Sequence, residues 1–175
     1  GELCKLLLKS FRKFEEFYNC LEINLLEISE KFKKKQQKKI SNKKVKWINT
    51  INDIGYGPII FLANEFFDAL PIKQIYRKKN LFFEKHVVLK NNNKDLEFVL
   101  KKAKKSLIKK IHNLNLISST NVIEYPIDAI KYLNKIIKKI NQFNGGILAF
   151  DYGYIQKEDN NTLQSISSHK FSNPL

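Results

Sequence analysis

The chain has 175 residues, about the size of one domain, and its 43% hydrophobic residues suffice for a core, which excludes a wholly disordered chain. Its formal net charge of +15 would suit a nucleic-acid partner. We do not favour that class, because arginine, which makes bidentate base and phosphate contacts, occurs only as Arg12 and Arg77. Lysine, asparagine, isoleucine and phenylalanine are enriched together, as AT-rich coding produces. We therefore expect no specific nucleic acid among the partners.

The metal-binding and membrane signals are weak. Cys4 and Cys20 are far apart and fit no metal-ligand spacing, which predicts a reduced, intracellular compartment and no metal site. No apolar run approaches the roughly 20 residues of a membrane span, so we expect none. The chain has no methionine and begins at Gly1, and we therefore expect a segment of a longer protein or the product of a broken gene.

In the first 58 residues, hydrophobic periodicity predicts a helix over 3–18, a strand over 21–28, a helix over 30–40, a strand over 45–51 and a loop over 52–58. The first strand ends at Glu27, and Ser29 is placed to cap the helix that follows it. The only tryptophan, Trp47, lies in the strand predicted over 45–51.

The stretch from Pro58 to Pro71 carries the strongest signal. An apolar run over 59–63 predicts a strand buried on both faces, as in a parallel sheet. Asn64 and Glu65 follow it, at the carboxyl end where open α/β sheets bind ligands. On this pattern alone, a core strand and a turn capped by Asn64 or Asp68 would be the simpler interpretation.

In the second half, strands are predicted over 72–77 and 81–88, joined by a turn at 78–80, and a turn at 91–94 leads to a short strand over 96–100. A partly helical stretch is predicted over 101–117. A helix then runs from Tyr125-Pro126 to Asn144-Gly145 and is followed by a strand over 146–151. The residues after Gly153 are polar and predicted to form a loop. The order of elements predicts an α/β fold, doubly wound and mostly parallel, with a β-hairpin insertion over about 72–122.

Three predicted strands end in acidic or amide side chains, at Glu27, at Asn64-Glu65 and at Asp151. In a doubly wound sheet these ends line one crevice, and a carboxylate such as Glu27 can accept both hydroxyls of a ribose. A glycine-rich turn should precede Glu27 by about 20 residues at a nucleotide site. Gly1 stands there, as the last glycine of such a loop or as an arbitrary first residue.

Residues 64–71, Asn-Glu-Phe-Phe-Asp-Ala-Leu-Pro, resemble the signature of the MidA-like methyltransferase family, which includes the mitochondrial arginine methyltransferase needed to assemble respiratory complex I. Further matches cover nearly the whole chain in the family's order, at 1–3, 26–29, Trp47, 145–154, 162–164 and 169–175. One position departs from the pattern: Glu30 stands where the family often has proline.

This resemblance implies a class I, Rossmann-like fold dependent on S-adenosyl-L-methionine, with residues 1–175 as a partial methyltransferase domain. The cofactor-binding residues that it implies are Gly1, Glu27, Asp53 and Asn64. The AT-rich composition suggests a bacterial source, so we expect a cytoplasmic enzyme or, as the alternative, one of the mitochondrial matrix.

The resemblance further implies a protein substrate with a target arginine. The catalytic residues are then Asn64, Glu65 and Asp68, and the substrate-binding residues are Glu65, Asp68, Asp151 and Tyr152. Carboxylates suit this substrate because they can hold a guanidinium bidentately and localise its charge. Two alternatives stay open: Asp68 caps a turn and Asp151 anchors a loop, or the whole chain is a catalytically inactive remnant or binding module of the same fold.

Overall fold

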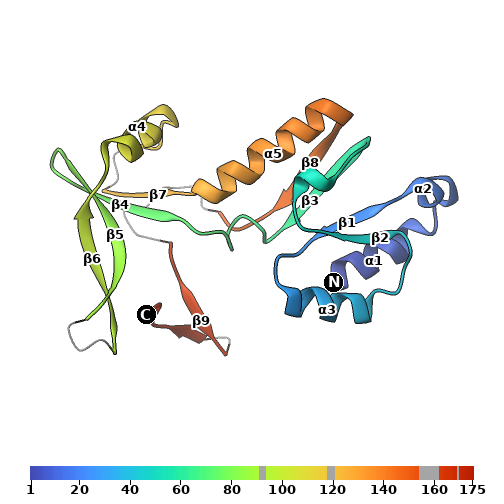
Figure 1. Ribbon diagram of the computed structural model, residues 1–175, viewed down its shortest axis with the longest axis horizontal. Coiled ribbons are helices and arrows are strands. Elements are labelled where there is room, and N and C mark those ends of the chain that lie inside the picture. Colours follow the sequence, from blue (N-terminus) through green and yellow to red (C-terminus); the bar gives the residue numbers. More distant parts are fainter. Residues whose placement is uncertain (91–93, 118–120, 154–161, 169) are drawn as a thin grey trace. The chain divides into compact units, whose positions relative to one another are not determined.

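The computed structural model describes residues 1–90, 94–117, 121–153, 162–168 and 170–175. The chain divides into two compact units, residues 1–60 with 135–146 and residues 61–134 with 147–175. The elements labelled in Figure 1 are α1 (Glu2–Phe11), α2 (Glu15–Cys20), β1 (Ile23–Leu26), α3 (Glu30–Lys39), β2 (Val45–Ile48), the 3-10 helix η1 (Ile51–Asp53), β3 (Ile59–Asn64), β4 (Lys73–Lys78), β5 (Leu81–Leu89), β6 (Leu96–Lys102), α4 (Lys105–Asn113), β7 (Val122–Tyr125), α5 (Ile127–Phe143), β8 (Gly145–Phe150), β9 (Ser165–Ser167) and β10 (Lys170–Ser172).

The first unit is built on the parallel strands β1 and β2, which pair from Ile23 opposite Val45 to Leu26 opposite Ile48. Helix α1, the residue that ends α3 and these strands share one core, whose buried members are Cys4, Leu8, Ile40 and Val45. The predicted cap is confirmed, because the Ser29 hydroxyl accepts a hydrogen bond from the Phe32 N–H at 3.4 Å. This cap fixes the start of α3 directly after β1.

The single helix predicted over 3–18 is wrong, because the structure has α1 and α2 with a break between Phe11 and Glu15. Phe14 precedes α2 with φ −116° and ψ 84°, outside the helical region. The break lets Phe11 and Phe17 pack edge to face with their ring centroids 5.1 Å apart, and it turns Tyr18 toward the core of the first unit. Tertiary packing of aromatic rings therefore overrides the local helical periodicity.

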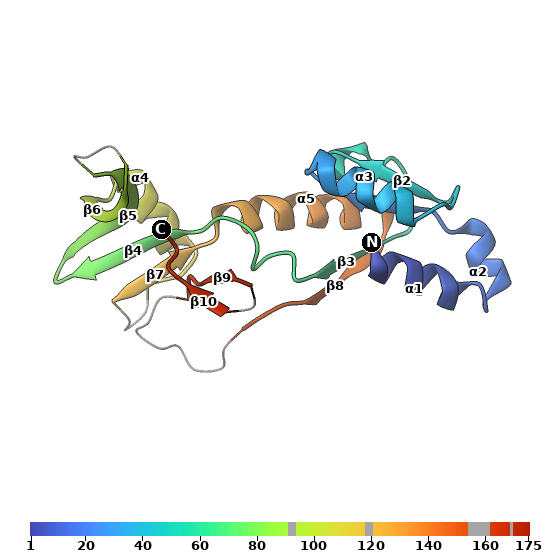
Figure 2. The same ribbon diagram turned by 90° about the horizontal axis from the view of Figure 1, so that it is seen from below.

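Strands β3 and β8 form a second parallel pair, seen side by side in Figures 1 and 2. The Ile59 N–H donates to the Asn144 carbonyl at 2.9 Å, and the Glu65 N–H donates to the Phe150 carbonyl at 2.8 Å. The pairing is close at Gly145, whose φ is +139° and where an added Cβ would lie 1.7 Å from the Ile59 carbonyl oxygen. Only glycine fits there, and the predicted left-handed end of α5 is confirmed by the φ of 60° at Asn144.

The expectation that the run over 59–63 is buried on both faces is wrong for this structure. Ala63 is buried, but the Ile60 side chain is 75% exposed and Leu62 is also exposed. The physical reason lies in the sheet, because within the described residues β3 pairs only with β8. A continuous apolar strand is covered only where strands flank it and helices pack on its faces.

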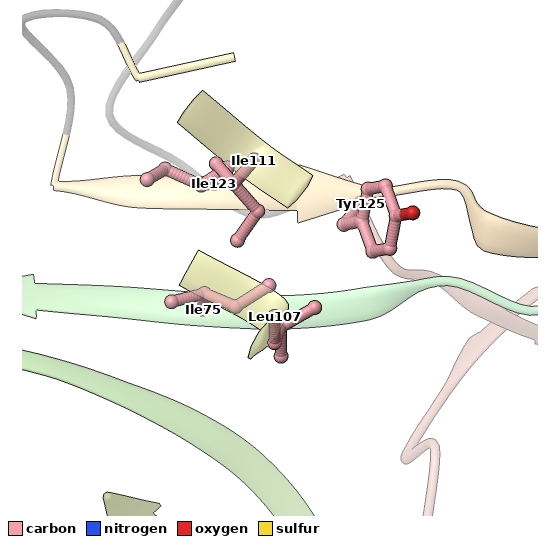
Figure 3. Close-up of a cluster of buried hydrophobic side chains, with 5 residues drawn as sticks. All are labelled: Ile75, Leu107, Ile111, Ile123 and Tyr125. Atoms are coloured by element: carbon pink, nitrogen blue, oxygen red, sulfur yellow. The ribbon is translucent and has the colours of Figure 1, made fainter. Parts of the chain in front are cut away.

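The predicted hairpin is confirmed and is part of a larger antiparallel sheet in the second unit, with the strand order β6-β5-β4-β7. Helix α4 packs on this sheet through successive turns. Figure 3 shows the core that results, in which Ile75 of β4, Ile123 and Tyr125 of β7, and Leu107 and Ile111 of α4 pack together. The partly helical stretch expected over 101–117 is thus strand β6 up to Lys102 and helix α4 from Lys105.

The tail expected to be a loop contains a hairpin, in which β9 and β10 pair antiparallel with Phe171 opposite Ile166. Ser168, with φ 50°, lies in the turn. Upstream of the hairpin, Thr162 donates its N–H and its hydroxyl to the Glu124 carboxylate at 2.9 and 2.6 Å. Residues 91–93 of the turn expected at 91–94, and the family matches at Tyr154 and His169, lie outside the described residues.

Candidate cofactor and substrate site

The turn at residues 64–68 follows β3 with an unusual backbone. Asn64 is the last residue of β3, and Glu65 has a φ of 47°, in the left-handed region that favours glycine. A glutamate in this region costs about 1 kcal/mol or more, so the surrounding structure must hold it there. The hydrogen bond from the Glu65 N–H to the Phe150 carbonyl does so, because it continues the β3–β8 pairing one residue past the strand. Backbone strain of this kind clusters at functional sites.

Asp151 fastens the same turn from the end of β8. Its Oδ2 accepts hydrogen bonds from the N–H groups of Phe67 at 2.8 Å and Asp68 at 3.3 Å, and its Oδ1 accepts from the Tyr152 N–H at 2.9 Å. Desolvation opposes ionisation, but these N–H groups outweigh it and hold the pKa of Asp151 below its ordinary value. We call this arrangement of Asp151 with residues 67, 68 and 152 the Asp151 clasp.

The clasp fits the second of the two roles open for Asp151, that of anchoring a loop. Phe66 supports the turn from its other side, with its ring 5.2 Å from that of Phe67 and 5.1 Å from that of Tyr132 on α5. The side chains of Glu65 and Asp68 are exposed. The turn therefore presents two acidic side chains while its backbone is held by Asp151, and substrate binding by Asp151 and Tyr152 stays a prediction.

Glu27 lies just after β1 and is half-buried. Its Oε1 accepts a hydrogen bond from the Ser29 N–H at 2.9 Å, and its Oε2 accepts one from the Gln36 Nε2 at 2.9 Å. A carboxylate has about four acceptor positions, so each oxygen keeps capacity for one further donor. This is the donor–acceptor arrangement that two ribose hydroxyls require, and Glu27 therefore fits the cofactor assigned to it.

Gly1 lies close to the same group. A Cβ added to Gly1 would come 3.3 Å from the Ile40 Cδ1 and 3.4 Å from the Gln36 Cγ, so the space beside its backbone is narrow. Gly1 is therefore packed against the Ile40 and Gln36 side chains, and its place at the end of a cofactor loop stays a prediction.

Asp53 has a structural task that the sequence did not indicate. Its Oδ2 accepts hydrogen bonds from the N–H groups of Asn49 and Thr50, each at 3.1 Å, and Thr50 in turn caps η1 in a capping box. These bonds fix the loop that follows β2 at the carboxyl end of that strand. A role of Asp53 toward the adenine stays a prediction.

The predicted residues fall into two groups. Gly1, Glu27 and Asp53 belong to the first compact unit, whereas residues 64–68 and Asp151-Tyr152 belong to the second. In the first unit Gly1 and Glu27 both lie beside Gln36, and in the second Asp151 holds the turn at Phe67 and Asp68. The grouping of Asp53 with Gly1 and Glu27 stays a prediction, as does the expectation that both groups line one crevice. Sequence reasoning missed Gln36, although a neutral residue that interrupts a run of lysines in α3 was a visible signal.

Comparison with protein-family models matches residues 1–175 to the family described as "Putative S-adenosyl-L-methionine-dependent methyltransferase". The chain belongs to this family. The resemblance carried by residues 64–71 and by the matches along the chain is confirmed. The cofactor of the family is S-adenosylmethionine, as the resemblance implied.

Curated relatives of the chain are named as protein arginine methyltransferases. "Protein arginine methyltransferase NDUFAF7 homolog, mitochondrial" of Caenorhabditis elegans is 30% identical over 71% of this chain and 29% of its own length. "Protein arginine methyltransferase NDUFAF7, mitochondrial" of Xenopus tropicalis is 26% identical over 100% of this chain and 46% of its own length. The chain spans less than half the length of these relatives.

Two crystal structures of Burkholderia thailandensis proteins share the fold. One, bound to S-adenosyl-homocysteine, matches with a TM-score of 0.60 and 15% identity over 78% of this chain and 35% of that chain. The other, a native structure, matches with a TM-score of 0.53 over 66% of this chain and 32% of that chain. With the parallel pairs β1–β2 and β3–β8, this likeness confirms the predicted α/β, Rossmann-like fold class. Within the described residues, no helix combines the length and apolarity needed to cross a bilayer.

Proposed function

We propose that this protein is an S-adenosylmethionine-dependent methyltransferase that modifies arginine side chains of a protein substrate. The observation that carries the proposal is the turn at 64–68, which presents Glu65 and Asp68 at the carboxyl ends of two parallel strands and is held there by the Asp151 clasp. Open α/β sheets bind their ligands at such ends. The family description and the names of the relatives support the same activity.

The acidic turn suits arginine for a physical reason. A guanidinium is a poor nucleophile while its charge is delocalised over three nitrogens. Glu65 and Asp68 accept hydrogen bonds from its N–H groups, localise the charge on the nitrogens that they contact and aim the remaining nitrogen at the methyl group. With the cofactor bound, the bond between its sulfur and the methyl carbon would break as that carbon passes to the nitrogen, and Glu65 would accept the proton that the nitrogen loses. Asn64 and Tyr152 border the reacting nitrogen and help to orient it.

The first unit serves the cofactor. When bound, S-adenosylmethionine supplies a methyl group on a positively charged sulfur. Glu27 accepts hydrogen bonds from the two ribose hydroxyls at the acceptor positions that Ser29 and Gln36 leave free. These hydrogen bonds are charge-assisted, because the carboxylate is ionised. Gly1, which packs beside Gln36, contributes its backbone to the cofactor loop, and the loop that Asp53 fixes after β2 borders the adenine.

The experiment is a transfer assay with S-adenosylmethionine labelled in its methyl group and arginine-containing acceptor proteins, followed by amino-acid analysis. We expect labelled methylarginine, and a loss of about 100-fold or more in rate for Glu65→Gln, because removal of one general base or charged contact costs that much. Glu16→Gln, at an exposed position in α2, is the matched control. Label in another amino acid contradicts the arginine assignment.

The alternative function, a binding module with the same fold, gives a different pattern in this assay. Such a module binds S-adenosyl-homocysteine, which can be followed by calorimetry, yet transfers no methyl group to any acceptor.

We also propose that the antiparallel sheet β6-β5-β4-β7 is an insertion within one methyltransferase domain. The mitochondrial names of the relatives support the mitochondrial alternative over bacterial cytoplasm, which fractionation of the source cells tests.

A further inference from the structure

Three side chains of the first unit form a hydrogen-bonded relay that ends on Glu27. The Trp47 Nε1–H of β2 donates to the Gln36 Oε1 of α3 at 2.9 Å, and the Gln36 Nε2 donates to the Glu27 Oε2 at 2.9 Å. We propose that Gln36 is a positioning residue, which holds the Glu27 carboxylate in the orientation that accepts a ribose and is itself oriented by Trp47. This inference rests on the proposed function.

The chemistry of its neighbours fixes which way round the Gln36 amide lies. An indole N–H can only donate, so it requires the carbonyl oxygen of Gln36. An ionised carboxylate can only accept, so Glu27 requires the amide nitrogen. Both demands are met in one orientation and both fail in the flipped one. The relay therefore has a single arrangement, and the Glu27 carboxylate is held at Oε1 by Ser29 and at Oε2 by Gln36.

The neutrality of Gln36 matters as much as its reach. Helix α3 has the sequence EKFKKKQQKK, in which six of ten residues are lysine. At the position that contacts Glu27, this helix carries an amide. An ammonium there would form an ion pair with Glu27 and compete with the ribose hydroxyls for its oxygens. The amide orients the carboxylate without neutralising it and leaves an acceptor position on each oxygen.

The relay also joins Glu27 to Gly1, another residue assigned to the cofactor in this unit. The backbone of Gly1 lies beside the Gln36 side chain, since an added Cβ would be 3.4 Å from the Gln36 Cγ. Trp47 stands opposite Leu25 in the parallel pair β1–β2, so it reaches Gln36 from the strand adjacent to the one that ends near Glu27. The Gln36 side chain thus lies against Gly1, Glu27 and Trp47. A ligand that moves the Glu27 carboxylate therefore also changes the surroundings of the Trp47 indole.

Trp47 is the only tryptophan of the sequence, so its fluorescence reports the relay directly. The experiment titrates S-adenosyl-homocysteine into the wild-type protein, Gln36→Leu and Gln37→Leu, with affinity from calorimetry and with tryptophan emission recorded in parallel. Gln37 is an exposed neighbour on the same helix and serves as the matched control. We expect about tenfold weaker binding for Gln36→Leu, as for other residues that orient a ligand-binding group, and an unchanged affinity for Gln37→Leu. The emission change on binding should persist in the control and diminish in Gln36→Leu.

Gln36→Glu separates positioning from a merely structural role, and it keeps the side-chain volume if Gln36→Leu unfolds. It sets a second carboxylate against Glu27, and two such groups share a proton more readily as the pH falls. We expect weak binding at pH 8 and partial recovery toward pH 5, with no comparable trend in Gln37→Leu. Wild-type affinity in both Gln36 variants overturns the positioning proposal while the proposed function stands. If the wild-type protein itself shows no binding, the proposed function fails and the positioning role fails with it.

Discussion

Replacing Asp151 by alanine tests whether the turn that carries Glu65 and Asp68 is held in place by hydrogen bonds to one carboxylate. The substitution removes the acceptor of the Phe67, Asp68 and Tyr152 N–H groups. The site is exposed, so each bond is counted at the low end of the usual range, about 0.5 kcal/mol. Only the bonds from Phe67 and Asp68 tie Asp151 to the turn, so their sum is about 1 kcal/mol, which corresponds to a factor of about 5 in the equilibrium for opening of the turn.

The assay is native-state amide hydrogen exchange at Phe67 and Asp68, which reports local opening rather than global unfolding. We expect about fivefold faster exchange at these two amides in Asp151→Ala. Asp128→Ala, which removes the surface ion pair with Lys131 at 2.8 Å, is the control and should leave both rates unchanged. Unaltered protection of Phe67 and Asp68 in Asp151→Ala would refute the clasp.

The same clasp has a definite pH dependence. The N–H groups lower the pKa of Asp151 below its value in the unfolded chain, which is about 3.9. Its contribution to stability is therefore fully present above the unfolded pKa and is lost as the pH falls through the lower, folded pKa. Exchange at Phe67 should be insensitive to Asp151→Ala only under those acidic conditions. Equal effects of the substitution at acidic and neutral pH would contradict this linkage.

Three further predictions concern strain, close packing and a charge cluster. Glu65→Gly should raise the free energy of unfolding by about 1 kcal/mol, because it relieves the left-handed φ of 47°, while abolishing methyl transfer; chemical denaturation and the transfer assay measure the two effects. Gly145→Ala should lower the free energy of unfolding by about 4 kcal/mol or more, since its Cβ would lie 1.7 Å from the Ile59 carbonyl oxygen. Gly146→Ala, with open space around the added Cβ, is the control and should change the free energy of unfolding by less than about 1 kcal/mol. Equal melting temperatures of the two variants would contradict the close β3–β8 pairing at Gly145. The hydrogen bond from the Tyr56 hydroxyl to the Glu22 carboxylate raises the pKa of the Tyr56 phenol. The contribution of this bond to stability is therefore present below the unfolded pKa and is lost as the pH rises through the higher, folded pKa. Glu22→Gln should bring the pKa of Tyr56 back toward its ordinary value in an NMR titration, and an unchanged pKa would count against the contact.

Much of the candidate site could be predicted because it depends on local pattern. The apolar run over 59–63 and its abrupt end at Asn64 indicated a strand with functional residues after it, and the structure has β3 ending at Asn64. Glu27 was identified by its place at the end of a strand, and Ser29 by its capping position before α3. These features need only residues that are neighbours in sequence.

The rest depends on contacts between residues distant in sequence. The left-handed backbone at Glu65 is imposed by a hydrogen bond to Phe150 on another strand, and no local propensity of glutamate favours it. The role of Asp151 became visible only when its carboxylate was found on the N–H groups of Phe67 and Asp68. Gln36 likewise appears to periodicity as one more polar residue on the wet face of a lysine-rich helix, although its amide contacts Glu27.

The break between α1 and α2 is a further feature that depends on packing contacts, in this case against a local pattern that predicts one continuous helix. Residues 3–18 have a continuous helical pattern, yet the contact between Phe11 and Phe17 and the burial of Tyr18 are gained only if the helix stops. The hairpin of β9 and β10 was missed because its strands are of three residues each and mostly polar, too short for an alternating pattern to register.

The most direct test of the account is a calorimetric titration of the protein with S-adenosyl-homocysteine, wild type against Glu27→Gln. The account predicts saturable binding by the wild-type protein and at least tenfold weaker binding by the variant, because an amide offers one acceptor oxygen in place of two and no charge for the ribose hydroxyls. Equal affinities of the two proteins, or no binding by the wild type, would contradict it.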